Sequence, residues 1–198
     1  GFGGVSGLAD WIAENGVNFV VDATHPFAVV ISENARLACE KTRIQRLVLG
    51  RSQWIPHAND RWFHASDAYD AARLVPKLGR RPFLSVGSRD IDCFTGLETM
   101  KVVIRLIDEP NEPLPLKNYE LVKGRGPFEL QAEKCLLKEY EIDVIVTKNS
   151  GGSATYAKIL AARLATIPVI MIERPPPVVG EHVECIDQVV SWIEQRLN

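Results

Sequence analysis

A short apolar strand, a polar loop and a helix follow one another near the start of the chain. Residues 19–21 are apolar and β-rich, as in a buried strand. The polar loop Asp22–Phe27 ends this strand, because Pro26 cannot continue it, and residues 28–40 are a predicted helix. Pro26 suits the first helical position and Thr24 suits the N-cap. Such a loop lies at the carboxyl edge of an open α/β sheet, where ligands bind; the alternative is an ordinary turn that only caps the helix.

The same order of parts returns in the second half of the chain. A predicted buried strand over 142–147 is followed by the loop Lys148–Ser153 and by an alanine-rich helix predicted over 154–165. The two glycines of this loop let the main chain expose its amides, and its lysine adds a point charge. The loop is not a Walker loop, because no G-x-x-x-x-G-K-[ST] sequence occurs. It is nevertheless a candidate anion-binding loop.

Further strands and helices alternate along the chain. The remaining predicted elements are strands at 45–49, 81–87, 101–107, 119–122 and 167–172, and helices at 5–15, 66–78, 128–140 and 187–198, the last with Val190, Ile193 and Leu197 on its buried side. This alternation predicts α/β architecture with parallel strands. Because residues 57–66 are mostly polar and loop-like, we predict two domains, 1–62 and 63–198.

Basic residues follow several of the predicted strands. They are Arg51, Arg89, Arg125, Lys148 and Arg174. If the carboxyl edges of the two domains face one another, the cleft between them collects these five cations. A basic cleft in a chain of net charge −2 suits a small polyanion, such as a nucleotide, a polycarboxylate or both. For Arg51, a solvated surface role is the alternative.

Composition excludes several classes of protein. The net charge of −2 argues against a general nucleic-acid binder, and no apolar run approaches the ~20 residues that span a bilayer. The four cysteines lie far apart without a Cys-x-x-Cys pair, so neither a metal site nor a disulfide framework is indicated. We therefore expect a cytoplasmic protein without nucleic-acid or membrane partners. Because the chain starts at Gly1 without methionine, we also expect the natural protein to extend upstream.

The segment Asp22–Ala28, with Ser32–Ala35 one turn later, resembles the precorrin-6A reductase family of cobalamin biosynthesis. Other motifs agree in order and spacing: Gly1–Gly4, Arg51–Trp54, Gly124–Phe128, Thr147–Gly152, Thr155, Lys158, Ala161–Arg163 and Ile167–Pro175. The resemblance covers essentially the whole chain. It implies two Rossmann-like, open parallel-sheet domains facing a cleft. The first domain would be N-terminally truncated, because family members begin with a strand, a phosphate loop and a helix before the position of Gly1.

The resemblance also implies a reaction. Family members pass a hydride from NADPH, with NADH as the alternative, to precorrin-6A or its cobalt form, and they make precorrin-6B. This tetrapyrrole is a flat macrocycle fringed with carboxylates, which suits the basic loops. Other enzymes of the corrin pathway are candidate partners. Two other functions stay open: a nucleotide-dependent dehydrogenase acting on a small acid, and a non-catalytic tetrapyrrole-binding protein.

The candidate site residues fall into three groups. His25 and Lys148 are the candidate catalytic residues, as the nearest proton donors, although for Lys148 we favour neutralisation of a substrate carboxylate. The candidate cofactor-binding residues are Gly3, Gly4, Asp22, Ala23, Thr24, His25, Pro26 and Phe27. The candidate substrate-binding residues are Arg51, Arg89, Arg125, Lys148, Asn149, Ser150, Gly151, Gly152 and Thr155. Orientation of the two ligands would be the main task of the protein.

Overall fold

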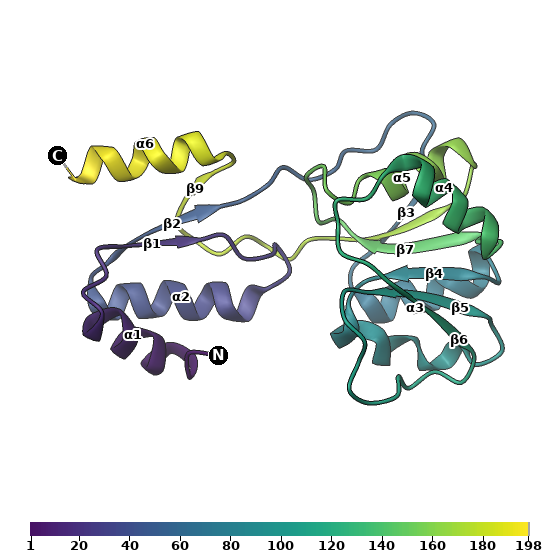
Figure 1. Ribbon diagram of the computed structural model, residues 1–198, viewed down its shortest axis with the longest axis horizontal. Coiled ribbons are helices and arrows are strands. Elements are labelled where there is room, and N and C mark those ends of the chain that lie inside the picture. Colours follow the sequence, from purple (N-terminus) through teal and green to yellow (C-terminus); the bar gives the residue numbers. More distant parts are fainter. Residues whose placement is uncertain (198) are drawn as a thin grey trace. The chain divides into compact units, whose positions relative to one another are not determined.

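The structure is a computed structural model and describes residues 1–197. The chain forms two compact units: unit 1 comprises Gly1–Ser52 and Arg174–Asn198, and unit 2 comprises Gln53–Glu173. Each unit has a sheet in which all strands are parallel, with helices packed on it (Figure 1), which confirms the predicted α/β class. No helix within residues 1–197 is long and apolar enough to cross a membrane.

Unit 1 is a three-stranded sheet between two layers of helices. Its strands are, in sheet order, β1 (Phe19–Asp22), β2 (Gln45–Leu49) and β9 (Glu181–Val183), and its helices are α1 (Gly4–Glu14), α2 (Val29–Thr42) and α6 (Ile186–Leu197). Successive residues of a strand point to opposite faces. Val20 accordingly packs with Ile12 and Ala38 of α1 and α2, whereas Phe19 packs edge-on against Trp192 of α6, with ring centroids 5.5 Å apart. The four-residue strand β1 therefore contacts the helices on both faces of the sheet.

The division into units differs from the predicted domains 1–62 and 63–198. The chain returns to unit 1 at its end, because β9 pairs with β2 and the Gly50 amide donates to the Val183 carbonyl at 2.9 Å. Glu181–Val183 is too short and polar to be recognised as a strand, and it becomes one only by pairing with the free edge of β2. At the other boundary, Trp54 belongs to the core of unit 2.

Of the three residues predicted for the buried side of the last helix, only Ile193 packs against the core of unit 1. Val190 and Leu197 are 47% and 68% exposed, whereas Val189 and Trp192 are buried. The indole of Trp192 packs against Phe19 and places Val189 over Leu47 of the sheet. The rotation of α6 is therefore set by the largest side chain that unit 1 can bury there. Asn198, the last residue of the predicted helix, lies outside the described residues.

Unit 2 is a doubly wound sheet of six parallel strands. In sheet order these are β3 (Trp62–Ala65), β8 (Val169–Ile172), β7 (Val144–Lys148), β4 (Pro82–Ser85), β5 (Val102–Leu106) and β6 (Tyr119–Lys123). The helical segments are α3 (Ala68–Leu78), the 3₁₀ segment η1 (Ser88–Leu97), α4 (Leu130–Glu139) and α5 (Ala157–Leu164). Most boundaries lie within a few residues of the predicted ones. Two elements of unit 2 were not predicted: η1, and β3, which lies in the segment 57–66 that was expected to be mostly loop.

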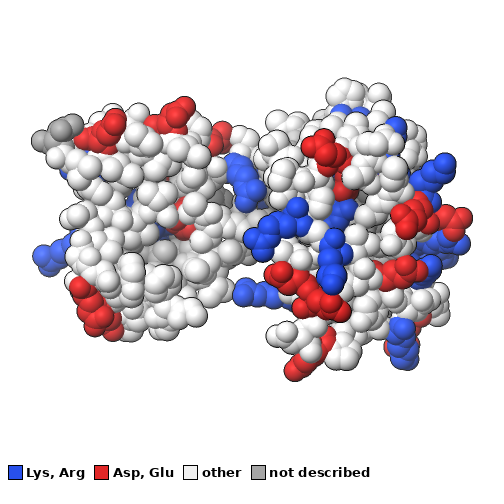
Figure 2. All heavy atoms as spheres, in the orientation of Figure 1, with Lys and Arg blue, Asp and Glu red and all other residues white. Residues whose placement is uncertain are grey.

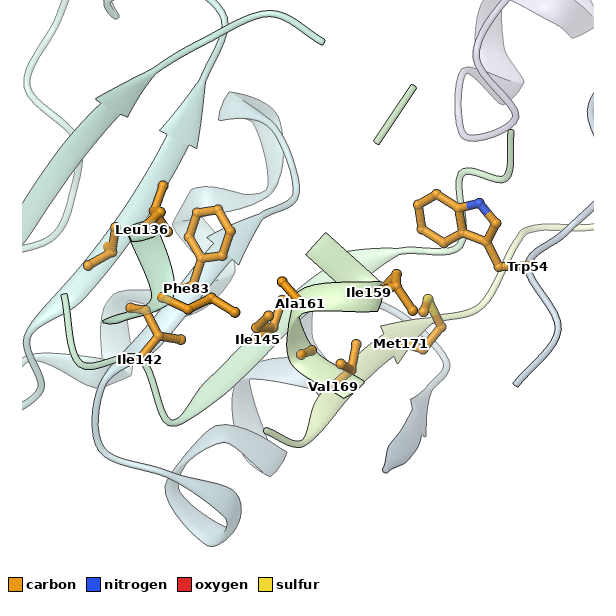
Figure 3. Packing of buried hydrophobic residues seen from close by; sticks show 12 residues of the cluster. Trp54, Phe83, Leu136, Ile142, Ile145, Ile159, Ala161, Val169 and Met171 are labelled. Carbon is orange, nitrogen blue, oxygen red and sulfur yellow. The ribbon is translucent and has the colours of Figure 1, made fainter. Parts of the chain in front are cut away.

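The larger core lies between this sheet and the pair α4 and α5. Phe83, Ile145, Val169 and Met171 of the strands pack there with side chains of the two helices, and Trp54 lies at one end of the cluster (Figure 3). By alternation, the intervening strand residues face the opposite side of the sheet, where α3 and η1 pack together. Both faces of the sheet are covered, which explains why its inner strands β4, β7 and β8 are mostly apolar and buried.

Candidate functional site

One buried carboxylate organises the loop Asp22–Phe27 in unit 1. Asp22 Oδ1 accepts hydrogen bonds from the Thr24 amide at 3.2 Å and the Thr24 hydroxyl at 2.8 Å. Asp22 Oδ2 pairs with Arg46 Nη1 at 3.0 Å, and the two side chains are only 1% and 5% exposed. Arg46 Nη2 also donates to the Val179 carbonyl at 2.6 Å. Asp22 therefore shapes the loop from beneath and ties it to β2 and to the segment before β9.

Thr24 does not cap α2 as predicted. The helix begins at Val29 after Ala28, and no side chain caps it. The Thr24 hydroxyl instead donates to Asp22, and its oxygen lies 2.7 Å from the Ser32 hydroxyl. A charged carboxylate is the stronger acceptor and draws the threonine back towards the strand. Ser32 belongs to the motif that follows the loop by one turn, and its hydroxyl contacts Thr24 of that loop.

The outer surface of this loop is formed by His25 and its neighbours. His25 and Ala23 are exposed, while Pro26 and Phe27 are partly buried. The Phe27 amide donates to His25 Nδ1 at 3.3 Å, the Ala28 amide donates to the His25 carbonyl at 2.7 Å, and the two rings lie 5.7 Å apart. The imidazole is thus held by its own loop, at an exposed position.

Gly3 and Gly4 lie at the same edge of unit 1. They have φ values of +83° and +72°, which favour glycine, and they lead into α1, whose start carries neither a side-chain cap nor an acidic residue. Because α1 runs antiparallel to the strands, its N-terminus lies at the carboxyl edge with the Asp22–Phe27 loop (Figure 1). Gly7 was not among the predicted site residues, yet a Cβ there would lie 1.9 Å from the Phe2 carbonyl oxygen. A glycine inside a helix, where it costs stability, was the available signal.

Unit 2 has a topological switch point between its neighbouring strands β4 and β7. After β4 the chain turns into η1, which packs with α3, whereas after β7 it turns into α5, which packs with α4 on the other face. Two loops that diverge from adjacent strands leave a crevice outside the carboxyl ends, and ligands bind there in open α/β sheets. Among the predicted residues, Arg89 lies in the first turn of η1, and Lys148–Gly152 run from the last residue of β7 into the loop that follows it.

Lys148 and Asp90 form an ion pair across the switch point. Lys148 is the last residue of β7, and Asp90 lies in the first turn of η1, next to the exposed Arg89. Figure 2 shows Lys and Arg side chains, with acidic ones beside them, at this end of unit 2. The lysine is therefore already matched by a carboxylate of the protein. This partner was not predicted, because Asp90 is distant from Lys148 along the chain.

Asn149 is bound by the backbone of Trp54. Its Oδ1 accepts from the Trp54 amide at 2.9 Å, and its Nδ2 donates to the Trp54 carbonyl at 3.1 Å. The Trp54 indole then donates to the Gly152 carbonyl at 2.7 Å. These three bonds hold the loop in a conformation in which Gly151 and Gly152 have φ values of +67° and +70°. For Asn149, the visible role is to position the loop.

Replacing Asn149 with Ala should destabilise unit 2 by about 2 kcal/mol, because both backbone groups of Trp54 lose their partner in a buried place. Chemical denaturation gives the size, and hydrogen exchange should show faster exchange in peptides over 148–156. Asn118→Ala, at an exposed position, is the matched control. Equal stability of the two variants would contradict this role for Asn149.

The loop Gly124–Phe128 contacts the loop after β7. The Phe128 amide donates to the Ala154 carbonyl at 3.0 Å, and a Cβ on Gly126 would lie 3.0 Å from that same oxygen. Thr155 packs beside Gly126, and Arg125 is exposed. Helices α4 and α5 start two or three residues later than predicted, since these residues form the loop contact. Arg125 and Thr155 are thus brought to the same end of unit 2 as Lys148.

Arg51 and Arg174 both belong to unit 1. Arg51 is exposed, and its carbonyl accepts from Arg174 Nη1 at 2.6 Å, while Arg174 Nη2 donates to the Ser52 carbonyl at 3.4 Å. Burial, followed by the charge of Arg51, lowers the pKa of Arg174. Arg174 thus joins the two segments through which the chain leaves and re-enters unit 1.

The structure therefore sorts the predicted residues into two groups. Unit 1 carries Gly3, Gly4, Asp22–Phe27 and Arg51, and unit 2 carries Arg89, Arg125, Lys148–Gly152 and Thr155. Each group lies at carboxyl ends of parallel strands. Within residues 1–197, no three His, Cys, Asp or Glu side chains are grouped so that they could hold a metal ion.

Comparisons with known proteins identify relatives over almost the whole chain. A family model described as precorrin-6x reductase CbiJ/CobK matches residues 1–194. The precorrin-6A reductase of Rhodococcus erythropolis is 44% identical, over 98% of this chain and 78% of the relative. The cobalt-precorrin-6A reductase of Methanocaldococcus jannaschii is 31% identical, over 94% of this chain and 76% of the relative.

A solved structure described as CobK precorrin-6A reductase superposes with a TM-score of 0.94 at 38% identity, over 98% of this chain and 78% of that chain. The fold match and the sequence matches point to the same family, and they do not favour a small-acid dehydrogenase or a non-catalytic carrier. The chain belongs to the precorrin-6A reductase family of cobalamin biosynthesis.

Proposed function

We propose that this chain reduces precorrin-6A, or its cobalt form, to precorrin-6B with NADPH, unit 1 holding the cofactor and unit 2 the macrocycle. One observation carries the assignment of the substrate to unit 2: the switch point between β4 and β7 is flanked by loops that bear Arg89, Lys148 and two glycines in a left-handed conformation. Exposed main-chain amides and cations at such a place suit carboxylates.

The residues of unit 1 fit a nicotinamide dinucleotide. The start of α1 offers main-chain amides without a side-chain cap, which suit an anionic group of the cofactor, and Gly3 and Gly4 let a ligand approach closely. The ordered rings of His25 and Phe27 would support the nicotinamide. When bound, the cofactor supplies the hydride. The chain's own contribution is to hold this surface rigid, which Asp22 does through Thr24 and Arg46.

Within unit 2, the macrocycle carboxylates would meet Arg89, Arg125 and Lys148, and the glycine amides of the Lys148–Gly152 loop. Arg89 and Arg125 are exposed and Lys148 is partly so. A bound carboxylate would compete with Asp90 for the ammonium group of Lys148. Reduction also consumes a proton, and His25 is an exposed candidate to deliver it.

The central experiment follows oxidation of NADPH by the purified protein with precorrin-6A, with its cobalt form and with simple keto acids, and repeats each assay with NADH. We expect turnover with a precorrin and a higher kcat/KM with NADPH. Activity on keto acids alone would overturn the proposal, and binding of the macrocycle without oxidation would indicate a carrier.

Replacing Lys148 with Ala should raise the KM for the precorrin about tenfold and change kcat less than about threefold, because the ammonium group binds a carboxylate that is charged throughout the reaction. Steady-state kinetics at saturating NADPH measure both values. Lys148→Arg keeps the charge and should recover most of the affinity. A large fall in kcat with unchanged KM would instead assign Lys148 to proton transfer.

A further inference from the structure

Three charged side chains are buried together in unit 2, on elements that adjoin the substrate loops. Arg105 of β5 and Glu133 of α4 form an ion pair, with Nη1 and Oε1 2.8 Å apart and side chains 8% and 1% exposed. Lys158, in the first turn of α5, is 4% exposed. Two cations and one carboxylate leave one net positive charge in the interior.

This cluster, Arg105–Glu133–Lys158, lies directly beneath both loops. The Arg105 guanidinium stacks on Phe128, its carbon 4.1 Å from the ring centroid, and Phe128 ends the loop that carries Arg125. The Lys158 ammonium group lies 5.4 Å from the centroid of Trp54, whose indole binds the Gly152 carbonyl. One aromatic ring thus separates each buried cation from a loop that bears candidate substrate residues.

Lys158 is placed unfavourably for stability. Burial, and then the charge of Arg105, lower the pKa of Lys158 to about 8, while Glu133 opposes them. A cation in the first turn of a helix also opposes the helix dipole. Natural proteins keep such costly groups where function needs them. A methionine would fill the same space without these costs.

We propose that Lys158 is a positioning residue that supplies buried positive charge to the anion site between β4 and β7, and so strengthens binding of the polycarboxylate from below the loops. The inference rests on the proposed function, and it names an electrostatic support that makes no contact with the substrate. A buried charge acts through a medium of low polarity, so that ions screen it less than they screen the exposed arginines. At about 10 Å, with an effective dielectric constant of about 20, one charge is worth about tenfold in affinity for one carboxylate.

The proposal predicts a particular dependence on pH. The charge on Lys158 disappears as the pH rises through about 8, whereas the charged groups that face it, Arg105 and Glu133, belong to β5 and α4 and keep their pairing. Wild-type protein should therefore bind a polycarboxylate about tenfold more weakly at pH 9.5 than at pH 7.

The test uses uroporphyrin I, a flat macrocycle with eight carboxylates, as the probe, and measures its Kd by fluorescence titration at pH 7 and pH 9.5. Lys158→Met should bind about tenfold more weakly than wild type at pH 7 and show no further loss at pH 9.5. Lys158→Arg should bind tightly at both pH values. Lys138→Met, which removes an exposed cation from the last turn of α4, is the matched control and should bind like wild type.

Thermal unfolding of the same variants gives a second readout. The folded-state pKa of Lys158 lies below its unfolded value, so the penalty is complete below pH 8 and is relieved between about pH 8 and 10.5. Lys158→Met should therefore raise Tm at pH 7 but not at pH 10.5. Loss of stability with unchanged uroporphyrin affinity would overturn the proposal, as would equal losses in the two methionine variants. Should Lys158→Met fail to fold, the pH series of wild type against Lys158→Arg decides: a loss confined to wild type supports the proposal, and parallel curves overturn it.

These measurements are independent of turnover. If uroporphyrin binding depends on Lys158 while NADPH is not oxidised with any precorrin, the proposed reaction fails and the anion site stands. If turnover occurs and uroporphyrin affinity does not depend on Lys158, the proposed reaction is supported and the inference on Lys158 is wrong.

Discussion

Replacing Asp22 with Ala is expected to destabilise unit 1 by about 3–5 kcal/mol, because it leaves the Arg46 guanidinium buried without its counter-charge. The same change frees Thr24 and removes the frame of the candidate cofactor loop. Hydrogen exchange measured on peptides of each unit separates this loss from any change in unit 2. We expect faster exchange across β1 and β2, and weaker binding of NADPH.

Two variants make the Asp22 prediction specific. Asp10→Ala removes an exposed carboxylate from α1 of the same unit and should change stability by less than about 0.5 kcal/mol. The double variant Asp22→Ala with Arg46→Met removes both charges and should recover part of the lost stability. If the double variant is less stable than Asp22→Ala by the full cost of a second independent change, the two side chains do not act as a pair.

Replacing Glu133 with Leu is expected to destabilise unit 2 by about 3–5 kcal/mol, because Arg105 and Lys158 then remain buried as two unbalanced cations. Chemical denaturation measures the loss, and hydrogen exchange should place it in β5, α4 and α5. Glu139→Leu, at an exposed position near the end of the same helix, is the matched control.

Adding Lys158→Met to the Glu133→Leu variant should restore part of its stability, since it removes one of the two cations. A Glu133→Leu protein as stable as the control would show that the carboxylate is not needed to hold the cluster together. A double variant no more stable than Glu133→Leu would show that Glu133 does not stabilise the charge of Lys158.

The local parts of the fold were readable from the sequence. The buried strands β5, β7 and β8 are apolar runs bounded by polar or proline-containing segments, so their position follows from composition over a few residues. The loops after β1 and β7 were identified as candidate binding loops because they end such strands. The starts of α4 and α5 were misplaced, since the residues before them bond to one another across two loops.

The candidate site was predictable in its residue types but not in its partners. Lys148 and Asp22 stand in loops that the sequence singles out, yet Asp90 and Arg46 pair with them only because neighbouring parallel strands bring distant residues together. Lys158 belongs to the motifs that resemble the family, but nothing in the sequence links it to Arg105 and Glu133, because each residue looks like an ordinary charge in its own segment. Burial, which no single segment reveals, turns them into one cluster.

The sequence alone determined the α/β class and the two candidate binding loops after β1 and β7. Its motifs also indicated the reductase family. The class and the loops depend on interactions between residues near each other in the chain. The family is indicated by the order and spacing of its motifs. The tertiary structure decided that β9 joins β2, that α6 turns Val189 and Trp192 inward, and which charges are paired or buried. Those outcomes depend on backbone hydrogen bonds and on burial between segments that are far apart in the sequence. These interactions contribute free energy only once the sheets have formed.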